Sequence, residues 1–320
     1  MANLIITNNC NADCGFCFAA ASRSGMIRAD HRQMDEADFR SWMAFLSRSG
    51  IREVRLLGGE PTLHPDFPRF VGMARDAGFT VVVFTNGVMP AQALDALAGI
   101  PEDACSVVVN LSAAIRAADG QRQAFTLEKL GPRVTPGLTL TSPDLSFVPA
   151  VGLIHTFGLR KSIRLGLSNP TWGGSNQALH PKRYPAVGKA LLEQSFLTAR
   201  HGIALEADCG FVRCMFGDQF DRLCENGFRY VSRCTPVLDC CPGGTILPCF
   251  GLSQVLTVSR DDLPDARAVY KRFVQKLKPF RAAGVYPECG ECPYFRTSEC
   301  CGGCLAARLR RFQPLEQEVL

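Results

Sequence analysis

Apolar runs with alternating spacing and segments with helical spacing follow one another along the first two thirds of the chain. Short apolar runs bounded by turn residues read as strands, and apolar residues recurring every three or four positions read as helices. This alternation is typical of repeated strand–helix units around a mainly parallel sheet, the α/β class. The strands are expected at residues 3–7, 54–57, 80–85, 107–111, 137–141 and 162–167.

The segment between the first two strands predicts a well-defined helix. Asp35 and Glu36 stand at its start, where a helix favours negative charge, and Phe39, Trp42 and Leu46 share one face. A seventh short strand is expected at residues 203–206, leading into Cys209. Further helices are expected at residues 67–76, 91–98, 122–130, 145–157, 182–201 and 266–280.

The composition changes at about residue 207. Ten of the 16 cysteines lie between Cys224 and Cys304, separated by Pro and Gly, with little helical spacing before residue 266. We therefore expect an α/β unit over residues 1–206 and a cysteine-rich, loop-dominated unit over residues 207–320. A chain of 320 residues with 47% hydrophobic content can bury a core of barrel size and a smaller appendage.

The charge distribution and the N-terminal sequence limit which binding partners and which cellular compartment we expect. The 35 basic and 30 acidic residues are spread along the chain without a basic stripe, so no nucleic-acid partner is expected. The start has no basic leader, and no apolar run approaches the length of a membrane span, so we expect a cytoplasmic protein without a membrane partner. In a reducing compartment, clustered cysteines are more often metal ligands than disulfides.

Three cysteines follow directly after the first expected strand. Cys10, Cys14 and Cys17 are separated by three and then two residues. A loop with this spacing can place three thiolates around one face of a four-iron cluster, which leaves one iron without a protein ligand. Structural zinc normally has four protein ligands, and no His or further Cys follows nearby to complete the set. The triad therefore favours an iron–sulfur cluster over zinc.

The triad, with an aromatic residue before its third cysteine, resembles the signature of the radical S-adenosylmethionine (SAM) superfamily. Three further segments are similar to that family's pattern and occur in the same order. By themselves they also read as ordinary turns after strands. They are Gly58-Gly59-Glu60 followed by Pro61, then Thr85-Asn86-Gly87, and then Asn110 with Ser112.

This resemblance implies a partial (βα)6 barrel over roughly the first 205 residues, with a [4Fe–4S] cluster on the triad. The iron without a protein ligand would chelate SAM, and an electron from the cluster would split SAM into methionine and a 5′-deoxyadenosyl radical that abstracts a substrate hydrogen. A low-potential donor such as flavodoxin or ferredoxin is the implied partner. The implied SAM-binding residues are Gly58, Gly59, Glu60, Thr85, Asn86, Asn110, Ser112 and Ser168.

The C-terminal cysteines resemble a SPASM domain, which follows many radical SAM enzymes. Nine residues separate Cys234 from Gly244 and four separate Gly244 from Cys249, as in its first half. Its second half, C-x2-C-x5-C-x3-C, has seven residues in the middle gap here, and the final downstream cysteine is missing. The resemblance implies a first auxiliary cluster on Cys234, Cys240, Cys249 and Cys304 and a second on Cys289, Cys292 and Cys300.

Several alternatives stay open for these cysteines. The second cluster lacks one ligand, which Cys301, another cysteine, an oxygen atom or open coordination could supply, or the cluster is absent. Paired zinc knuckles are also compatible with Cys289-x-x-Cys292 and Cys301-x-x-Cys304.

Residues 208–216 contain the candidates for catalysis. Asp208, Cys209 and Cys214 follow the seventh expected strand. The two cysteines are compatible with roles as additional ligands, as a hydrogen-atom donor or as a redox pair. Their setting among Phe and Met is equally compatible with buried apolar packing, and Cys105 is expected in the core.

Three functions are compatible with these features. The first is a maturase that modifies a peptide or protein side chain, with a separate recognition protein as a partner, because the triad begins too early in the chain for a leader-binding module to precede it. The second is a radical oxidoreductase of a small metabolite. The third, from another class, is a zinc-stabilised binding protein.

Overall fold

One curved sheet organises the computed structural model, which describes residues 1–19, 33–113, 115–171 and 176–312. Its 11 strands lie in the order β11-β10-β9-β1-β2-β3-β4-β5-β6-β7-β8, and the pairs from β9 through β8 are parallel. The strands of the first part are β1 (Ala2–Thr7), β2 (Glu53–Gly58), β3 (Thr80–Thr85), β4 (Cys105–Asn110), β5 (Val134–Leu140), β6 (Ser162–Leu167) and β7 (Ala204–Ala207).

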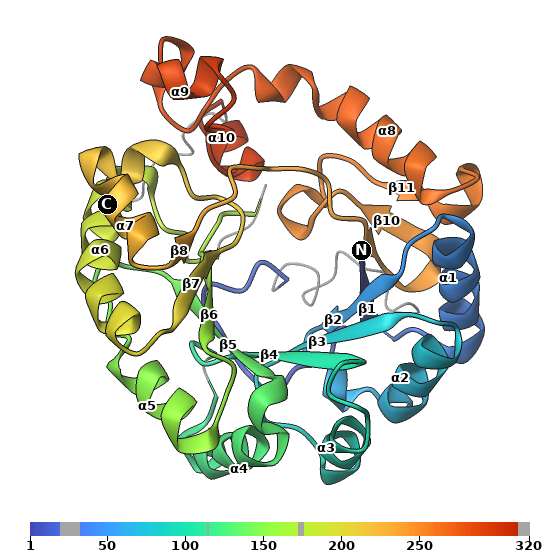
Figure 1. The fold of residues 1–320 in the computed structure, drawn as a ribbon. Coiled ribbons are helices and arrows are strands. Elements are labelled where there is room, and N and C mark those ends of the chain that lie inside the picture. Colours follow the sequence, from blue (N-terminus) through green and yellow to red (C-terminus); the bar gives the residue numbers. More distant parts are fainter. Residues whose placement is uncertain (20–32, 114, 172–175, 313–320) are drawn as a thin grey trace, which may run out of the picture.

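Helices cover the outer side of this sheet, as Figure 1 shows for α1 to α6. Asp35 begins α1 as predicted, because its side chain accepts a hydrogen bond from the backbone N–H of Asp38. Along β3, Val81 and Val83 are buried, whereas Phe84 on the other face is half-buried. The core therefore lies between sheet and helices α1 (Glu36–Arg48), α2 (Phe67–Asp76), α3 (Ala91–Ala98), α4 (Gly120–Leu130), α5 (Val148–Phe157) and α6 (Tyr184–Arg200).

The C-terminal third continues the same sheet at both edges. At one edge β8 (Phe228–Arg229) pairs with β7, and at the other β9 (Asp239–Cys240) pairs with β1. The hairpin of β10 (Thr245–Leu247) and β11 (Val258–Ser259) follows β9 and is antiparallel. Among the described residues β8 and β11 are edge strands, so the barrel is partial, as predicted.

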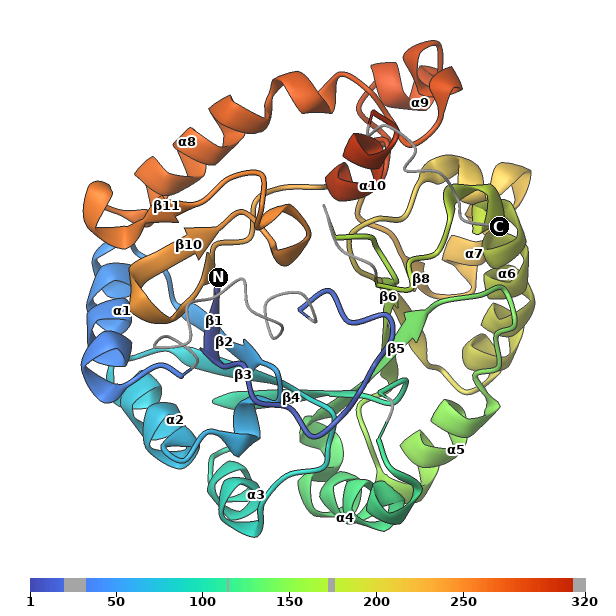
Figure 2. The same cartoon turned by 180° about the vertical axis from the view of Figure 1, so that it is seen from behind.

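Three C-terminal helices lie across the opening between the two sheet edges, as Figures 1 and 2 show from opposite sides. They are α8 (Ala266–Leu277), α9 (Pro293–Arg296) and α10 (Leu305–Arg310), whereas α7 (Phe220–Glu225) lies beside α6. The expectation of a loop-dominated unit after residue 207 therefore misses the part that β8 to β11 take in the common sheet.

The predicted strands and long helices are present in the structure. The helix expected from residue 145 begins at Val148, with Pro149 in its first turn, a position that proline favours. Helices α7, α9 and α10 were not expected, because runs of four to six residues carry too little apolar spacing to be recognised. In the described part of the chain, no helix is both long and apolar enough to cross a membrane.

Candidate functional site

The cysteine triad lies on the loop that leaves the C-terminal end of β1. The backbone N–H of Ala12 donates to Cys10 Sγ at 3.4 Å, and that of Cys17 donates to the Cys14 carbonyl at 2.9 Å. Residues at the carboxyl ends of parallel strands are where α/β barrels gather their ligands. The loop is therefore folded on itself at the end of the sheet where a site is expected.

Two glycines let β2 approach this loop. A Cβ on Gly58 would lie 2.1 Å from the Thr7 carbonyl oxygen, and a Cβ on Gly59 would lie 2.3 Å from that of Asn9. The next residue, Glu60, donates its backbone N–H to the Asn9 carbonyl at 2.7 Å. From the sequence, Gly58 and Gly59 were expected to admit a ligand. In the structure, their missing side chains make room for the chain segment that carries Cys10.

The Glu60 carboxylate joins the ends of β2 and β3 in a buried network. It is only 1% exposed. Oε1 accepts from the Thr62 hydroxyl at 2.6 Å and the Thr85 hydroxyl at 2.7 Å, and Oε2 accepts from the Asn86 backbone N–H at 2.7 Å. Burial raises the pKa of Glu60 above its ordinary value, and these hydrogen bonds oppose the rise. Since each carboxylate oxygen has two lone pairs, Oε2 retains capacity for one more donor.

Asn86 connects this network to the triad loop. Its Nδ2 donates to Asn11 Oδ1 at 2.7 Å, and its Oδ1 accepts from the Val88 backbone at 2.8 Å. Asn11 in turn donates to the Val88 carbonyl at 2.8 Å. The predicted site residues Thr85 and Asn86 therefore hold the protein chain around the triad through their side chains.

A second support comes from the segment after β6, which the sequence prediction missed. Gln177 donates its backbone N–H to the Gly15 carbonyl at 2.8 Å, and Asn176 donates from Nδ2 to the Phe16 carbonyl at 3.2 Å. The predicted residue Ser168 donates its hydroxyl to the Gln177 carbonyl. The signal available in the sequence was a polar segment directly following a strand.

The predicted contacts on the fourth strand lie next to β5. Asn110 ends β4, and its Nδ2 lies 3.4 Å from the Thr139 hydroxyl. The Ser112 hydroxyl accepts from the Thr139 backbone at 3.0 Å. Both residues are half-buried on the same end of the sheet as Glu60, so the structure brings the predicted polar residues to one edge.

Asp208, the candidate acid, is paired with a cation on the inner face of the sheet. Arg164 donates two hydrogen bonds to Asp208 Oδ2, at 3.2 and 2.5 Å, and its guanidinium lies 4.6 Å from the centre of the Phe84 ring. Asp208 therefore orients the Arg164 guanidinium beside Phe84, and a catalytic role for Asp208 stays a prediction.

The C-terminal cysteines are free thiols, and some of them affect one another's pKa. Burial raises the pKa of Cys249 well above its ordinary value, and the nearby Cys304, Asp239 and Cys234 raise it further. Burial also raises the pKa of Cys289, with Cys300 and Cys292 adding to the rise. Within the described residues, no three Cys, His or acidic side chains converge closely enough for one metal ion.

Cys240 lies on β9 opposite Leu4 of β1 and is fully buried. Burial raises its pKa well above the ordinary value, and Cys241 and Asp239 raise it further. Its assignment to the first auxiliary cluster stays a prediction.

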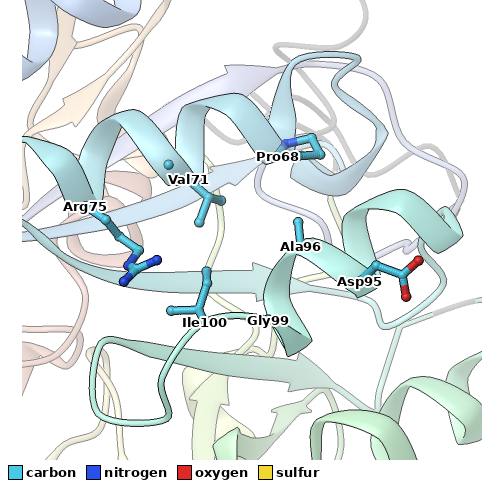
Figure 3. A pocket seen from close by; sticks show the side chains of 8 residues that line it. Pro68, Val71, Arg75, Asp95, Ala96, Gly99 and Ile100 are labelled. Atoms are coloured by element: carbon cyan, nitrogen blue, oxygen red, sulfur yellow. The ribbon is translucent and has the colours of Figure 1, made fainter.

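A cleft of ≈ 240 Å³ lies between α2 and α3, and Figure 3 shows the side chains that line it. Its wall includes Val71, Arg75, Asp95 and Ile100. None of the residues predicted for the site lines it. We treat it as a groove between two helices rather than as the site.

Comparison with known proteins agrees with this geometry. The Radical SAM superfamily profile matches residues 4–114, which include the triad, Glu60 and Asn110. The chain carries a radical SAM domain. The curated relatives that the chain matches are named as enzymes. The 7,8-dihydro-6-hydroxymethylpterin dimethyltransferase of Methanocaldococcus jannaschii is 35% identical over 91 residues, 28% of this chain and 17% of that protein.

A second relative of the radical SAM domain is the GTP 3′,8-cyclase of Chlorobaculum tepidum. It is 34% identical over 96 residues, which are 29% of this chain and 28% of the cyclase. The matches thus span less than a third of the length of either relative. Each match also covers less than a third of this chain.

Solved structures match over nearly the whole chain. SuiB of Streptococcus suis bound to precursor peptide SuiA gives a TM-score of 0.71 at 15% identity, covering 98% of this chain and 73% of SuiB. Native anSMEcpe with bound AdoMet gives 0.63 at 17% identity, covering 94% of this chain and 89% of that chain. At such identities the likeness is one of fold. It extends beyond the radical SAM domain into the cysteine-rich part.

The triad loop fits the iron–sulfur cluster that a radical SAM domain implies. The donor set is three cysteines on one short loop, and the N–H of Ala12 already points at one sulfur, the kind of hydrogen bond that tunes cluster potentials. Gly58 and Gly59 hold this loop against β2.

Proposed function

We propose that this protein uses SAM to abstract a hydrogen atom from a peptide or protein side chain. The observation that carries the proposal is the triad loop, tied to Glu60 and Asn86 at the end of a partial barrel. Likeness in fold to SuiB, described as bound to its precursor peptide, supports a peptide as the substrate.

Each set of residues has a defined task in this proposal. Cys10, Cys14 and Cys17 hold the cluster, which when bound supplies the electron that splits SAM and so generates the hydrogen-abstracting radical. Glu60 Oε2 accepts a hydrogen bond from the SAM ammonium group, which offsets the cost of the buried carboxylate charge. The half-buried Asn110 and Ser112 offer polar contacts to the ribose or carboxylate of SAM.

The C-terminal cysteines supply auxiliary clusters, and a separate protein presents the peptide. Such clusters offer a path for the electron that leaves the substrate when it is oxidised. The electron that starts the reaction comes from flavodoxin or ferredoxin. The C-terminal cysteines lie after residue 114, where the domain match ends, so the match itself does not assign them a role.

A small metabolite is the second candidate substrate, because the curated relatives are named for pterin and GTP chemistry. Their likeness covers less than a third of this chain. The zinc-stabilised binding protein has lost its support, since the chain carries an enzyme domain.

The test is an anaerobic incubation with SAM and dithionite after iron and sulfide reconstitution. We expect 5′-deoxyadenosine to form, and a short peptide encoded beside the gene to change in mass. GTP and a pterin serve as competing substrates in parallel reactions. Conversion of GTP or the pterin, with the peptide unchanged, would replace the first proposal by the second.

A further inference from the structure

Arg164 projects from β6 into the interior of the partial barrel. Its neighbours along the strand, Ile163 and Leu165, are fully buried in the core between the sheet and the helices. Arg164 points the other way, since its guanidinium meets the ring of Phe84 on β3. Strands β4 and β5 lie between β3 and β6 in the sheet, as Figure 1 shows, so this contact runs across the concave face.

The register of the sheet places Arg164 at the level of a residue proposed to contact SAM. Asn110 of β4 is paired with Gly137 of β5, and Gly137 is paired with Arg164. Neighbouring strands lie about 4.7–4.9 Å apart, so roughly 10 Å separates the backbones of Asn110 and Arg164. Paired residues point to the same face, and Gly137 has no side chain that would stand between these two. Arg164 is therefore within reach of a substrate that lies against the proposed SAM site.

Two contacts fix the Arg164 guanidinium in one orientation. Asp208 Oδ2 accepts hydrogen bonds from both Nε and Nη2, and the Phe84 ring lies beside the planar group. Within the described residues Nη1 donates to no partner, and the Arg164 side chain is 25% exposed. A guanidinium has five N–H donors, so the edge formed by Nη1 and Nη2 retains two parallel donors. An arginine already held in place loses little further side-chain freedom when it binds a ligand through that edge.

A second arginine borders the same ring. The Arg55 guanidinium on β2 lies 6.0 Å from the centre of the Phe84 ring, and its Nε donates to Glu53 at 2.9 Å. The side chains of Arg55 and Glu53 are 19% and 35% exposed. Burying charged groups away from water is costly, and these side chains keep part of their contact with it. The concave face around Phe84 is therefore polar, as the binding surface for a polar substrate needs to be.

The remaining edge of Arg164 matches a carboxylate. Two parallel N–H donors bind both oxygens of a planar carboxylate in a bidentate pair, whereas an amide carbonyl offers only one oxygen. Asp208 does not occupy this edge, because its Oδ2 accepts from Nε and Nη2. In a peptide, the group with the required geometry is the side chain of an acidic residue or the C-terminal carboxylate.

We propose that Arg164 binds a carboxylate of the substrate through Nη1 and Nη2, with Asp208 and Phe84 as positioning residues. The inference rests on the proposed function and deepens it, because it names an anionic group that the peptide presents to the barrel interior. Binding there fixes the substrate at the level of Asn110, and so relative to SAM.

The first test measures the binding of three small probes to the iron-loaded protein with SAM and without a reductant, by saturation-transfer NMR titration. N-acetylglutamate α-amide carries only a side-chain carboxylate, N-acetylglutamine only a terminal carboxylate, and N-acetylglutamine amide neither. We expect one of the two charged probes to bind at least about tenfold more tightly than the uncharged one. Equal affinity for all three, or no binding of either charged probe, would overturn the proposal. This comparison uses the wild-type protein and so does not depend on a variant folding.

Variants then assign the binding to Arg164. Arg164→Gln should weaken the charged probe by about 10- to 100-fold, and Arg164→Lys, which keeps the charge without the two parallel donors, should recover only part of the loss. Arg160→Gln is the matched control, because Arg160 is exposed in the turn before β6, and it should bind like wild type. Wild-type affinity in Arg164→Gln, or an equal loss in Arg160→Gln, would refute the assignment.

Turnover separates this inference from the proposed function. In the modified peptide, each acidic residue is replaced by its amide in turn, and the C-terminus is amidated. One of these changes should raise KM for wild type by about 10- to 100-fold with little effect on kcat, and should not raise it further for Arg164→Gln. Wild type that forms no 5′-deoxyadenosine with SAM and dithionite would contradict the proposed function, whereas probe binding alone decides the carboxylate site.

Discussion

The triad and the C-terminal cysteines are both sets of cysteines, but they are distributed differently along the chain. Cys10, Cys14 and Cys17 lie on one short loop, and Gly58 and Gly59 let the start of that loop lie against the end of β2. The C-terminal cysteines instead come from the β9–β10 region and from segments around the last helices. A site on one loop can be recognised by its spacing, whereas a site made from distant segments depends on packing that spacing does not report.

The largest expected effect concerns the triad loop and its close contact with Gly59. Gly59→Ala places a Cβ 2.3 Å from the Asn9 carbonyl, which forces the triad loop away from β2. We expect the loss of about four irons and of 5′-deoxyadenosine formation, measured by iron analysis and chromatography.

Gly72→Ala is the control for this variant. Nothing lies within 4 Å of the added Cβ, and the residue is inside α2. It should keep full activity and raise the free energy of unfolding by about 0.5–1 kcal/mol. If Gly59→Ala behaved like this control, the close approach of Gly59 to Asn9 would not be needed to hold the triad loop in place.

The next largest effect concerns the C-terminal cysteines, which come from segments far apart in the sequence. Cys292→Ala should spare SAM cleavage, because the triad is untouched, and should lose the modified substrate. Product is measured by mass spectrometry, alongside 5′-deoxyadenosine in the same reaction. Full product formation in this variant would mean that Cys292 has no part in turnover.

A smaller effect is expected at Glu60, which connects the triad loop to β3. Glu60→Gln retains an acceptor but loses the charge opposite the SAM ammonium group. A hydrogen bond to a charged group contributes about 1.5–3 kcal/mol, so we expect SAM to bind roughly 10- to 100-fold more weakly. Equilibrium dialysis measures the affinity, and unchanged affinity would remove Glu60 from the SAM site.

The smallest effect is a pH dependence of SAM binding. Burial raises the pKa of Glu60, so its carboxylate gains a proton at a higher pH than an ordinary glutamate. Only the ionised form attracts the ammonium group, so affinity should be full above this pKa and fall as the pH drops through it. Glu60→Gln should show no such dependence, and parallel pH profiles for the two proteins would contradict this explanation.

Much of the fold could be predicted from the sequence, because its strands and helices carry strong local signals. Val81 and Val83 alternate with less buried residues, and Asp35 caps α1 where expected. The pairing of β9 with β1 could not be predicted, since it joins Asn3 to Asp239 over a separation that no local pattern encodes.

The candidate functional site could be predicted from the sequence to a similar extent. The triad and Glu60 were found through motifs on single loops, and the structure brings them to one end of the sheet. Asn176 and Gln177 were missed, because a polar segment after a strand is common and only its contact with Gly15 gives it a role. Cys240 was assigned to a cluster through the SPASM resemblance, whereas no local pattern could predict its place on β9 opposite Leu4.

The most direct test of the account is Cys14→Ala, prepared without oxygen and assayed with SAM and dithionite. We predict the loss of one four-iron cluster, read by iron content and Mössbauer spectroscopy, together with the loss of all 5′-deoxyadenosine. Retention of wild-type cleavage by this variant would contradict the assignment of the SAM-cleaving cluster to the triad.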